Sequence, residues 1–447
     1  MKRFAAFALI ALLAAAGLAA SGKQESKAGA QPVKLVVWWQ GESEAPGTQK
    51  WLGEAIEVYQ QAHPQVTVEA KLQSQDTMIT EFKAAATAKD PKVGPDIQYF
   101  WDGTYTLEDA WSGNLAPLTG LIPDKELSSM LTMTRIWDGK AWGAGFYLAG
   151  ISILYNKSYF KKAGLDPENP PKTWNDFMAA CAALKKAGIT PFSFGLKDQW
   201  GNGWFVSEFG FSLLDSMEQM TKLVADGTFV DEEWVDFVRK VDDMRRKGYF
   251  NDDAASIDFL QGWDLFPQGK VAMTMVSDSL IAQYAKMLGT DNLGIMTAPA
   301  IGTGKLSHRY SPQIQGLGIT SWSVRKKEAA DFLTFLHGKT MIDSFYNSTG
   351  ILPADSKFDP ALIKYPQQKL IYDSVLSKNP RFVFWMECFF PAALDYEGWY
   401  PTFQQLWSGE LNPEGVIHKC QEVLEKWRQQ NPQQVDIYRK WDIPEGF

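Results

Sequence analysis

The chain has 447 residues, of which 45% are hydrophobic and 21% are charged, and its formal net charge is -8. This length is enough for two or more domains, each with a buried core, and the composition is that of a globular protein. The negative charge argues against nucleic acid and anionic lipid as partners, because both bind clustered Lys and Arg.

The first residues have the layout of a secretory signal. Lys2 and Arg3 precede an apolar run from Phe4 to Leu18, and small residues follow that run. The run is shorter than the roughly 20 residues that a transmembrane helix needs. We therefore predict a signal peptide over residues 1–22 and export to the periplasm or to the outer face of the cytoplasmic membrane.

The cleavage site has two interpretations. Ser21 stands where a bacterial lipoprotein box would carry its lipidated cysteine. The site is either an ordinary signal cut after Ala20 or Gly22, or an altered lipobox that takes no lipid. Residues 23–32 are polar and are predicted to form a tether.

The cysteines and histidines predict neither a disulfide framework nor a metal site. The chain has an odd number of cysteines, Cys181, Cys388 and Cys420, and they lack CxxC spacing. The four His are scattered without paired ligand spacing. Cys181 lies in a helical run and is predicted to pack in the core. A bridge between Cys388 and Cys420 stays open, and no cofactor is expected.

Strands and helices alternate in the part of the chain after the tether. Apolar or alternating runs predict strands at 33–39, 66–72 and 94–102. Helical spacing predicts helices at 43–64 and 76–89. This alternation indicates a parallel sheet with helices on its faces.

A second unit of the same kind follows. Extended apolar runs lie at 141–160 and 270–278, and between them a helix is predicted to begin after Thr173 as its N-cap and to end at Gly188. Beyond residue 320 the pattern becomes mainly helical. The sequence therefore predicts an α/β fold with two units.

Six segments carry a family resemblance over nearly the whole mature chain. They are KLVVWW, GPDIQYFWDG, DGKAWGAGFYLAGISILYNKSYFKKAGL with PPKTWNDFMAACAALKK, FPQGKVAMTMVSD, QGLGITSWSVRKKEAADFLTFLHG with STGILPA, and SGELNPEGVIHKCQEVLEKW. In this order they resemble the extracellular solute-binding proteins of bacterial ABC sugar importers, the group that includes the maltose-binding protein.

The resemblance implies a monomeric, two-lobe periplasmic-binding-protein fold of type II, with the ligand cleft between the lobes and closure by hinge bending. Three chain crossings would lie near 146–151, near 298 and near 350–353. One lobe would then comprise residues 33–146 and 298–350. The other would comprise residues 147–297 and 351–447.

Aromatic and polar residues gather where predicted strands end, which is where open α/β sheets bind ligands. A sugar needs flat aromatic platforms together with side chains that both donate and accept hydrogen bonds. The predicted contacts at strand ends are Trp39, Gln40, Glu42, Trp101, Asp102 and Asp278. Further segments pair tryptophan with polar groups, at Trp200, Asn202, Trp204, Trp263, Trp385 and Glu387.

The resemblance adds four more contacts, Tyr147, Gln313, Gln315 and Trp399, and it supports Asp278. By contrast, Trp234 and Trp427 are interpreted as packing residues. Gly150 departs from the family pattern, because other members carry an acidic sugar contact there, and this argues against a maltose-type ligand.

These residues favour capture of a neutral disaccharide or oligosaccharide and its delivery to an inner-membrane ABC permease with its ATPase. Lys197 and Arg381 are the nearest basic residues, so a strongly anionic sugar is not favoured. One alternative is a glycoside hydrolase, for which Glu42, Asp102, Asp278 and Glu387 offer carboxyl pairs. Another is a binder of polyamine, glycerol phosphate, iron or peptide. The sequence favours a non-enzymatic sugar receptor over both.

Overall fold

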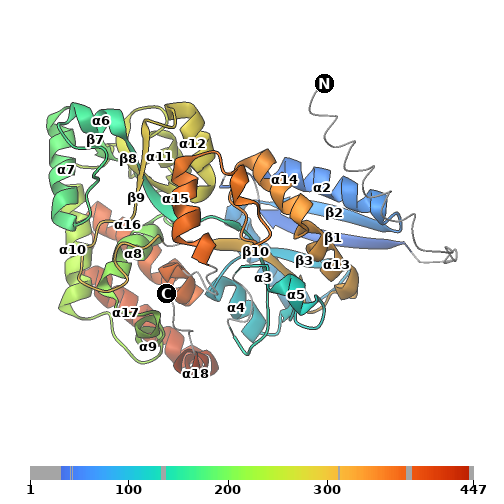
Figure 1. Cartoon of the computed structure of the whole chain (residues 1–447). Coiled ribbons are helices and arrows are strands. Elements are labelled where there is room, and N and C mark those ends of the chain that lie inside the picture. The colour runs from blue at the N-terminus through green and yellow to red at the C-terminus, as the bar shows by residue number, and fades with distance from the viewer. Residues whose placement is uncertain are drawn as a thin grey trace.

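The structure, a computed structural model, describes residues 32–40, 42, 44–131, 137–310, 313–378 and 385–441. The predicted signal peptide and residues 23–31 of the predicted tether lie outside this part. Figure 1 shows two groups of elements side by side, each with its own sheet. The predicted α/β architecture with two units is confirmed.

The first sheet has the strand order β2-β1-β3-β10-β4, and β5 also pairs with β10. Its strands are β1 (Val33–Gln40), β2 (Val66–Gln73), β3 (Ile97–Trp101), β4 (Leu115–Ala116), β5 (Ala144–Leu148) and β10 (Ile314–Thr320). β1 runs parallel to β2 and β3, whereas β10 runs antiparallel to β3, β4 and β5. The helices of this unit are α2 (Thr48–Ala62), α3 (Gln75–Ala88), α4 (Thr104–Trp111), α5 (Asp124–Leu127), α13 (Lys326–Leu336) and α14 (Lys339–Thr349).

The second sheet has the order β7-β8-β6-β9. Its strands are β6 (Ile151–Asn156), β7 (Thr190–Phe192), β8 (Val271–Ser277) and β9 (Leu293–Met296). The surrounding helices are α6 (Lys157–Lys162), α7 (Trp174–Lys186), α8 (Asn202–Gly210), α9 (Met217–Ala225), α10 (Glu232–Arg246), α11 (Phe259–Asp264), α12 (Ile281–Leu288), α15 (Pro366–Ser374), α16 (Tyr400–Ser408), α17 (Pro413–Gln430) and α18 (Pro432–Lys440).

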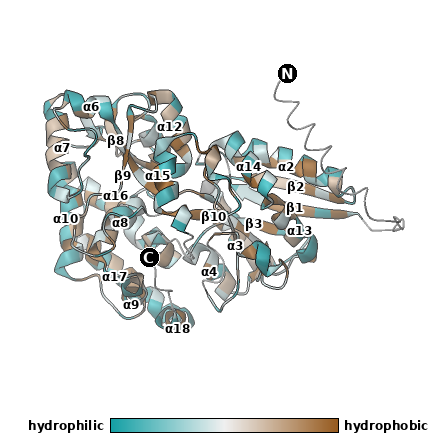
Figure 2. Cartoon of the chain, in the orientation of Figure 1, coloured by the Kyte–Doolittle hydropathy of each residue, from teal (hydrophilic) through white to brown (hydrophobic). Residues whose placement is uncertain are grey.

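Local sequence accounts for these elements. The Thr173 hydroxyl accepts a hydrogen bond from the Asp176 backbone N–H at 3.2 Å, which caps the start of α7 as predicted. All seven residues of β8 are buried, and the strand pairs with β6 on one edge and with β7 on the other. In Figure 2 the helices α2 and α14 carry both teal and brown residues, as expected of helices with one apolar face.

The chain leaves the first sheet after β5 and enters the second at β6, and it returns between β9 and β10. The predicted third crossing at 350–353 lies beside β5. Leu148 N–H donates to Leu352 O and Ala354 N–H donates to Phe146 O, both at 2.9 Å, so this segment continues the pairing of β5. Gln367, whose amide donates to Leu293 O at 2.7 Å, already belongs to the second unit.

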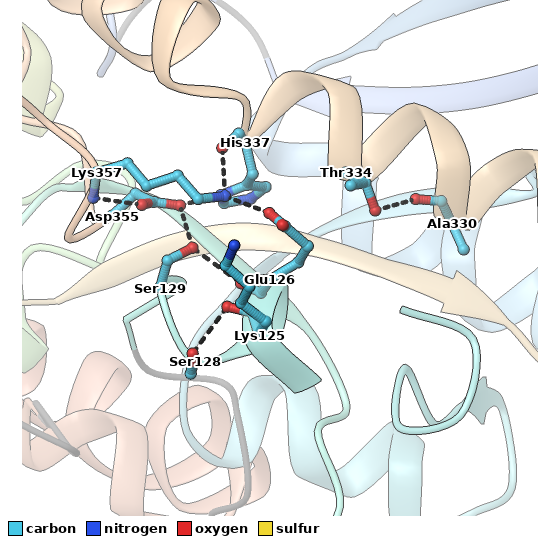
Figure 3. A network of polar contacts seen from close by, with 9 residues as sticks. All are labelled: Lys125, Glu126, Ser128, Ser129, Ala330, Thr334, His337, Asp355 and Lys357. Atoms are coloured by element: carbon cyan, nitrogen blue, oxygen red, sulfur yellow. Dashed lines mark hydrogen bonds and ion pairs between the residues drawn. The ribbon is translucent and has the colours of Figure 1, made fainter. Parts of the chain in front are cut away.

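A buried polar network fixes that third crossing to the first unit (Figure 3). Asp355 Oδ2 lies 2.9 Å from His337 Nδ1, and both side chains are 0% exposed. Asp355 also accepts hydrogen bonds from the Ser129 hydroxyl at 3.2 Å and from the Lys357 backbone N–H at 2.8 Å. Lys357 Nζ pairs with Glu126 Oε2 at 2.5 Å. The network therefore joins α5, the end of α13 and the chain after α14.

Replacing Asp355 with alanine is expected to lower the free energy of unfolding by about 3 kcal/mol, because it leaves buried donors without their acceptor. Urea unfolding of the mature chain measures this loss. The matched control is Asp373→Ala, which breaks an exposed ion pair with Lys369 and should cost less than about 1 kcal/mol. Equal losses in the two variants would show that the network does not stabilise the fold.

Candidate ligand-binding cleft

A cavity of about 610 Å³ lies between the two units. The first unit contributes Lys83, Trp101, Tyr105, Glu108, Gln313 and Gln315 to its walls. The second contributes Asp198, Trp200, Trp204, Trp385, Glu387 and Tyr400. A chamber of about 440 Å³ adjoins it and extends along α3 and α4, sharing Trp101, Tyr105 and Lys83 with it.

The turn after β3 brings the two units into contact beside this cavity. Gly103 has a φ of +66°, and a Cβ atom there would lie 2.2 Å from Cys388 O. Only glycine fits both the conformation and the close approach. The next residue, Thr104, donates its hydroxyl hydrogen bond to Phe390 O at 2.6 Å. This turn therefore packs directly on the second unit.

Aromatic rings form opposite walls of the cleft. Trp101 is half-buried at the end of β3, and its ring centroid lies 5.9 Å from that of Tyr105. Across the cleft, Trp204 packs edge-on against Trp200 at 5.5 Å and against Trp385 at 5.4 Å. These packed rings offer flat apolar faces to a ligand.

A line of hydrogen-bonded hydroxyl and carboxyl groups runs along one side of the cleft. Glu387, which is 4% exposed, accepts a hydrogen bond from the Tyr400 hydroxyl. The Tyr400 and Tyr105 hydroxyls lie 3.2 Å apart, and Tyr105 donates to Asp395 Oδ2 at 3.0 Å. Burial raises the pKa of Glu387 and of Asp395 well above the usual range, and the charges of Asp395 and Glu44 raise that of Glu387 further.

Two amide side chains from the first unit face the same space. Gln315 Oε1 accepts hydrogen bonds from the hydroxyls of Tyr99 and Tyr147. Gln313 Nε2 lies 3.4 Å from Cys388 Sγ. Because Tyr147 is buried behind Gln315 and does not line the cavity, it positions that amide.

Seven of the residues predicted from the sequence come together on the cavity wall: Trp101, Trp200, Trp204, Gln313, Gln315, Trp385 and Glu387. They come from four segments that are far apart in the chain. The strand end at Trp101 and the tryptophan pair at α8 are the sequence features that located the cleft.

Three predicted tryptophans belong to the hydrophobic core instead. Trp39 packs against Tyr99 and Phe146 behind the first sheet. Trp263 is buried, and its ring centroid lies 5.2 Å from that of Trp204. Trp204 lines the cavity, whereas Trp263 does not. Trp399 is 0% exposed. Trp39, Trp263 and Trp399, which the sequence predicts as ligand contacts, therefore lie off the cavity wall with their rings packed on other side chains.

Five predicted polar contacts hold the backbone or neighbouring side chains instead of lining the cavity. Glu42 accepts hydrogen bonds from the Gly47 and Gln49 N–H groups at the start of α2. Gln40 donates to Glu44 at 3.3 Å, and Asn202 donates to Tyr400 O at 2.7 Å. Asp102 accepts from Ile314 N–H at 3.1 Å, and Asp278 accepts from the Ser152 hydroxyl at 2.6 Å. Their packing explains why they do not reach the cleft.

Sequence reasoning missed several wall residues. Lys83, Tyr105, Glu108, Asp198 and Tyr400 line the cavity, although no strand end or tryptophan cluster marks most of them. The position of Tyr105 on the first turn after Trp101 was a usable signal. Trp427, interpreted as a packing residue, is buried and also touches the cavity.

The cysteines are free and buried. Cys181 lies in the core as predicted. The bridge left open between Cys388 and Cys420 is not formed, because Cys388 contacts Gln313 at the cleft whereas Cys420 lies on α17 near the Thr402 hydroxyl.

Asp278 is expected to make stability depend on pH. Burial raises its pKa from 3.8 to about 8, although the hydrogen bond from Ser152 opposes the rise. Between these values the folded chain keeps a proton that the unfolded chain releases, so the free energy of unfolding falls as pH rises. Asp278→Asn should therefore raise Tm more at pH 8 than at pH 5. The exposed control Asp436→Asn should show no such difference, and equal behaviour of the two would contradict the expectation.

The sequence model of the bacterial extracellular solute-binding protein family matches residues 41–340. The chain therefore belongs to this family. Its resemblance to sugar-importer binding proteins is confirmed at the level of family and fold. Within the described residues, no helix is both long enough and apolar enough to cross a membrane.

The chain spans about half the length of the curated relatives that it matches. The sn-glycerol-3-phosphate-binding periplasmic protein UgpB of Escherichia coli K12 is 32% identical over 217 residues, which cover 45% of this chain and 46% of the relative. UgpB of Salmonella typhimurium is 30% identical over 250 residues, covering 51% and 50%.

Solved structures match over almost their whole length. A chitin oligosaccharide binding protein superposes with a TM-score of 0.75 at 21% identity, covering 88% of this chain and 98% of its own. The maltose/maltodextrin-binding domain MalE from Bdellovibrio bacteriovorus, bound to maltotriose, superposes with a TM-score of 0.69 at 19% identity, covering 89% and 100%. At these identities the similarity establishes the two-lobe fold.

Proposed function

We propose that the chain is the substrate-binding component of a carbohydrate ABC importer, which captures a sugar in the cleft and delivers it to an inner-membrane permease with its ATPase. The observation that carries the proposal is the pair of aromatic walls, one from each unit, with carboxyl and amide groups between them. Rings stack on the C–H faces of sugars, and the polar groups bind hydroxyls. The solved relatives that bind chitin oligosaccharide and maltotriose support the same class of ligand.

Capture would proceed by closure of the two units around the sugar. Ligand bound to one wall favours the closed arrangement by the contacts that the other wall adds. The role is binding without catalysis, as in the family to which the chain belongs. We further propose that the receptor acts as a monomer, because both walls of the cleft come from one chain.

A second candidate cargo is sn-glycerol 3-phosphate, which the names of the curated relatives suggest. Phosphate sites need Arg, Lys or a helix N-terminus. Among the described residues that line the cavity, Lys83 is the one basic side chain, against the acids Glu44, Glu108, Asp198, Glu387 and Glu397. The cleft therefore favours a sugar over a phosphate ester.

A thermal-shift screen of the mature chain tests the proposal. Monosaccharides, disaccharides and oligosaccharides are compared with spermidine and sn-glycerol 3-phosphate. A cleft ligand present at 100 times its Kd adds about 2.7 kcal/mol to the free energy of unfolding and so raises Tm. A shift with a glycan supports the proposal. A shift with spermidine or sn-glycerol 3-phosphate alone would overturn it.

A further inference from the structure

Three buried carboxyl groups meet at one side of the cleft. Glu387 lines the cavity and is 4% exposed, Asp395 beside it is 1% exposed, and Glu44 also lines the cavity and is buried. The charges of Asp395 and Glu44 both act on Glu387. Acidic groups are therefore concentrated where a ligand would bind.

The hydrogen bonds that hold two of these groups come from tyrosines. Tyr400 donates to Glu387, and Tyr105 donates to Asp395 Oδ2 at 3.0 Å. The second oxygen of Asp395, Oδ1, is buried and has no hydrogen-bond partner within the described ranges. In the same part of the chain, no Lys, Arg or His forms an ion pair with Glu387 or Asp395.

The basic charge nearby is already balanced. Lys83 acts on Glu108 and Asp109 of α4, where its charge opposes the rise in pKa that burial causes. At the rim, Glu397 pairs with Lys426 at 3.1 Å. Among the described residues, neither of these lysines forms an ion pair with Glu387 or Asp395.

We propose that the sugar bound in this cleft carries a protonated amine, held by Glu387 and surrounded by the rings of Trp101, Tyr105 and Tyr400. This inference rests on the proposed function and replaces the neutral sugar expected from the sequence. An ammonium group supplies three donors, and it is attracted both by carboxylate and by aromatic faces. A phosphate would instead add negative charge to this corner.

The ammonium would also shift the ionisation of its neighbours. Glu387 faces Asp395, Glu44, Tyr105, Tyr400 and Cys388, and burial raises its pKa. A cation beside it favours the carboxylate, so binding releases a proton. Affinity for the amino sugar is therefore expected to rise as pH rises toward the raised pKa of Glu387, whereas affinity for a neutral sugar is not.

Isothermal titration calorimetry of the mature chain with matched sugar pairs tests the inference. The pairs are glucosamine with glucose, galactosamine with galactose, and the β-1,4 glucosamine dimer with cellobiose, with spermidine and sn-glycerol 3-phosphate alongside. At least one amino sugar should bind about tenfold or more tighter than its neutral counterpart, because hydrogen bonds to charged groups are strong. Titration in two buffers of different ionisation enthalpy should detect the released proton.

Glu387→Gln identifies the group responsible. This isosteric variant should lose the preference for the amino sugar and the proton release, while its Tm shows whether it folds. Glu414→Gln removes a carboxylate that pairs with Arg239 on the outside of the second unit, and it should keep both properties. Unchanged preference in folded Glu387→Gln would overturn the assignment.

The outcomes separate this inference from the proposed function. Tighter binding of an amino sugar with proton release supports both. Binding of neutral sugars as tight or tighter, or of N-acetylated sugars with no amino sugar bound, overturns the amine but leaves the sugar receptor. Binding of spermidine or of sn-glycerol 3-phosphate without any sugar overturns both.

Discussion

Trp101→Ala is expected to weaken binding of the cleft's sugar by about 30-fold or more in Kd, which corresponds to about 2 kcal/mol. Trp101 stands half-buried at the end of β3, where the main cavity meets the chamber along α3 and α4. Its removal takes away a flat apolar surface that the ligand would cover, and the variant should fold because the ring is not fully packed. Calorimetric titration with the sugar identified by thermal shift measures the loss.

Trp407→Ala is the matched control for Trp101→Ala. Trp407 is also half-buried, but it packs on Phe250 at 4.9 Å and on Phe194 at 5.8 Å and does not line the cavity. It should reduce Tm and leave Kd within about twofold. An unchanged Kd in Trp101→Ala, or an equal loss in Trp407→Ala, would show that Trp101 is not a ligand platform.

The sheets were predictable because their strands are short apolar runs with clear ends. The run at 33–39 forms β1. The run at 94–102 contains β3, which has Trp101 at its last position. Since strand ends meet at one edge of an open sheet, Trp101 could be placed beside a ligand without knowledge of the rest of the fold.

The remaining site residues depend on packing that the order of the chain does not show. Tyr400 and Glu387 are 13 residues apart and hydrogen-bonded, and the hydroxyl of Tyr105 from the other unit lies 3.2 Å from that of Tyr400. The same tryptophan-plus-polar pattern marked Trp204, on the cleft, and Trp263, behind it. Composition around a tryptophan therefore does not distinguish a platform from the core that supports it.

The third crossing illustrates the same limit. The family resemblance implies a third crossing near Gly350 to Pro353. Backbone hydrogen bonds to β5 and the burial of Asp355 against His337 keep the chain on the first unit. These hydrogen bonds join segments about 200 residues apart, so the order of the chain does not show them.

Trp399→Ala is expected to lower the free energy of unfolding by about 3–5 kcal/mol, the usual cost of deleting a large ring from a core. The ring is 0% exposed, with centroids 5.3 Å from Phe229 and 6.0 Å from Trp234. Its Nε1 has no hydrogen-bond partner among the residues that the structure describes, so Trp399→Phe loses volume alone and should cost less. Urea unfolding compares the two variants.

The same pair of variants decides between the two roles assigned to Trp399. If Trp399 is a core residue, folded Trp399→Phe should bind the sugar with a Kd within about twofold of the wild type, although its stability falls. If Trp399 contacts the ligand, Trp399→Phe should instead have a raised Kd and an unchanged free energy of unfolding. Trp399 is the last residue of the π-helix Leu394–Trp399, which carries Asp395, and its ring packs on Phe229 and Trp234. A loss of both stability and affinity would therefore mean that core packing sets the position of that carboxyl group.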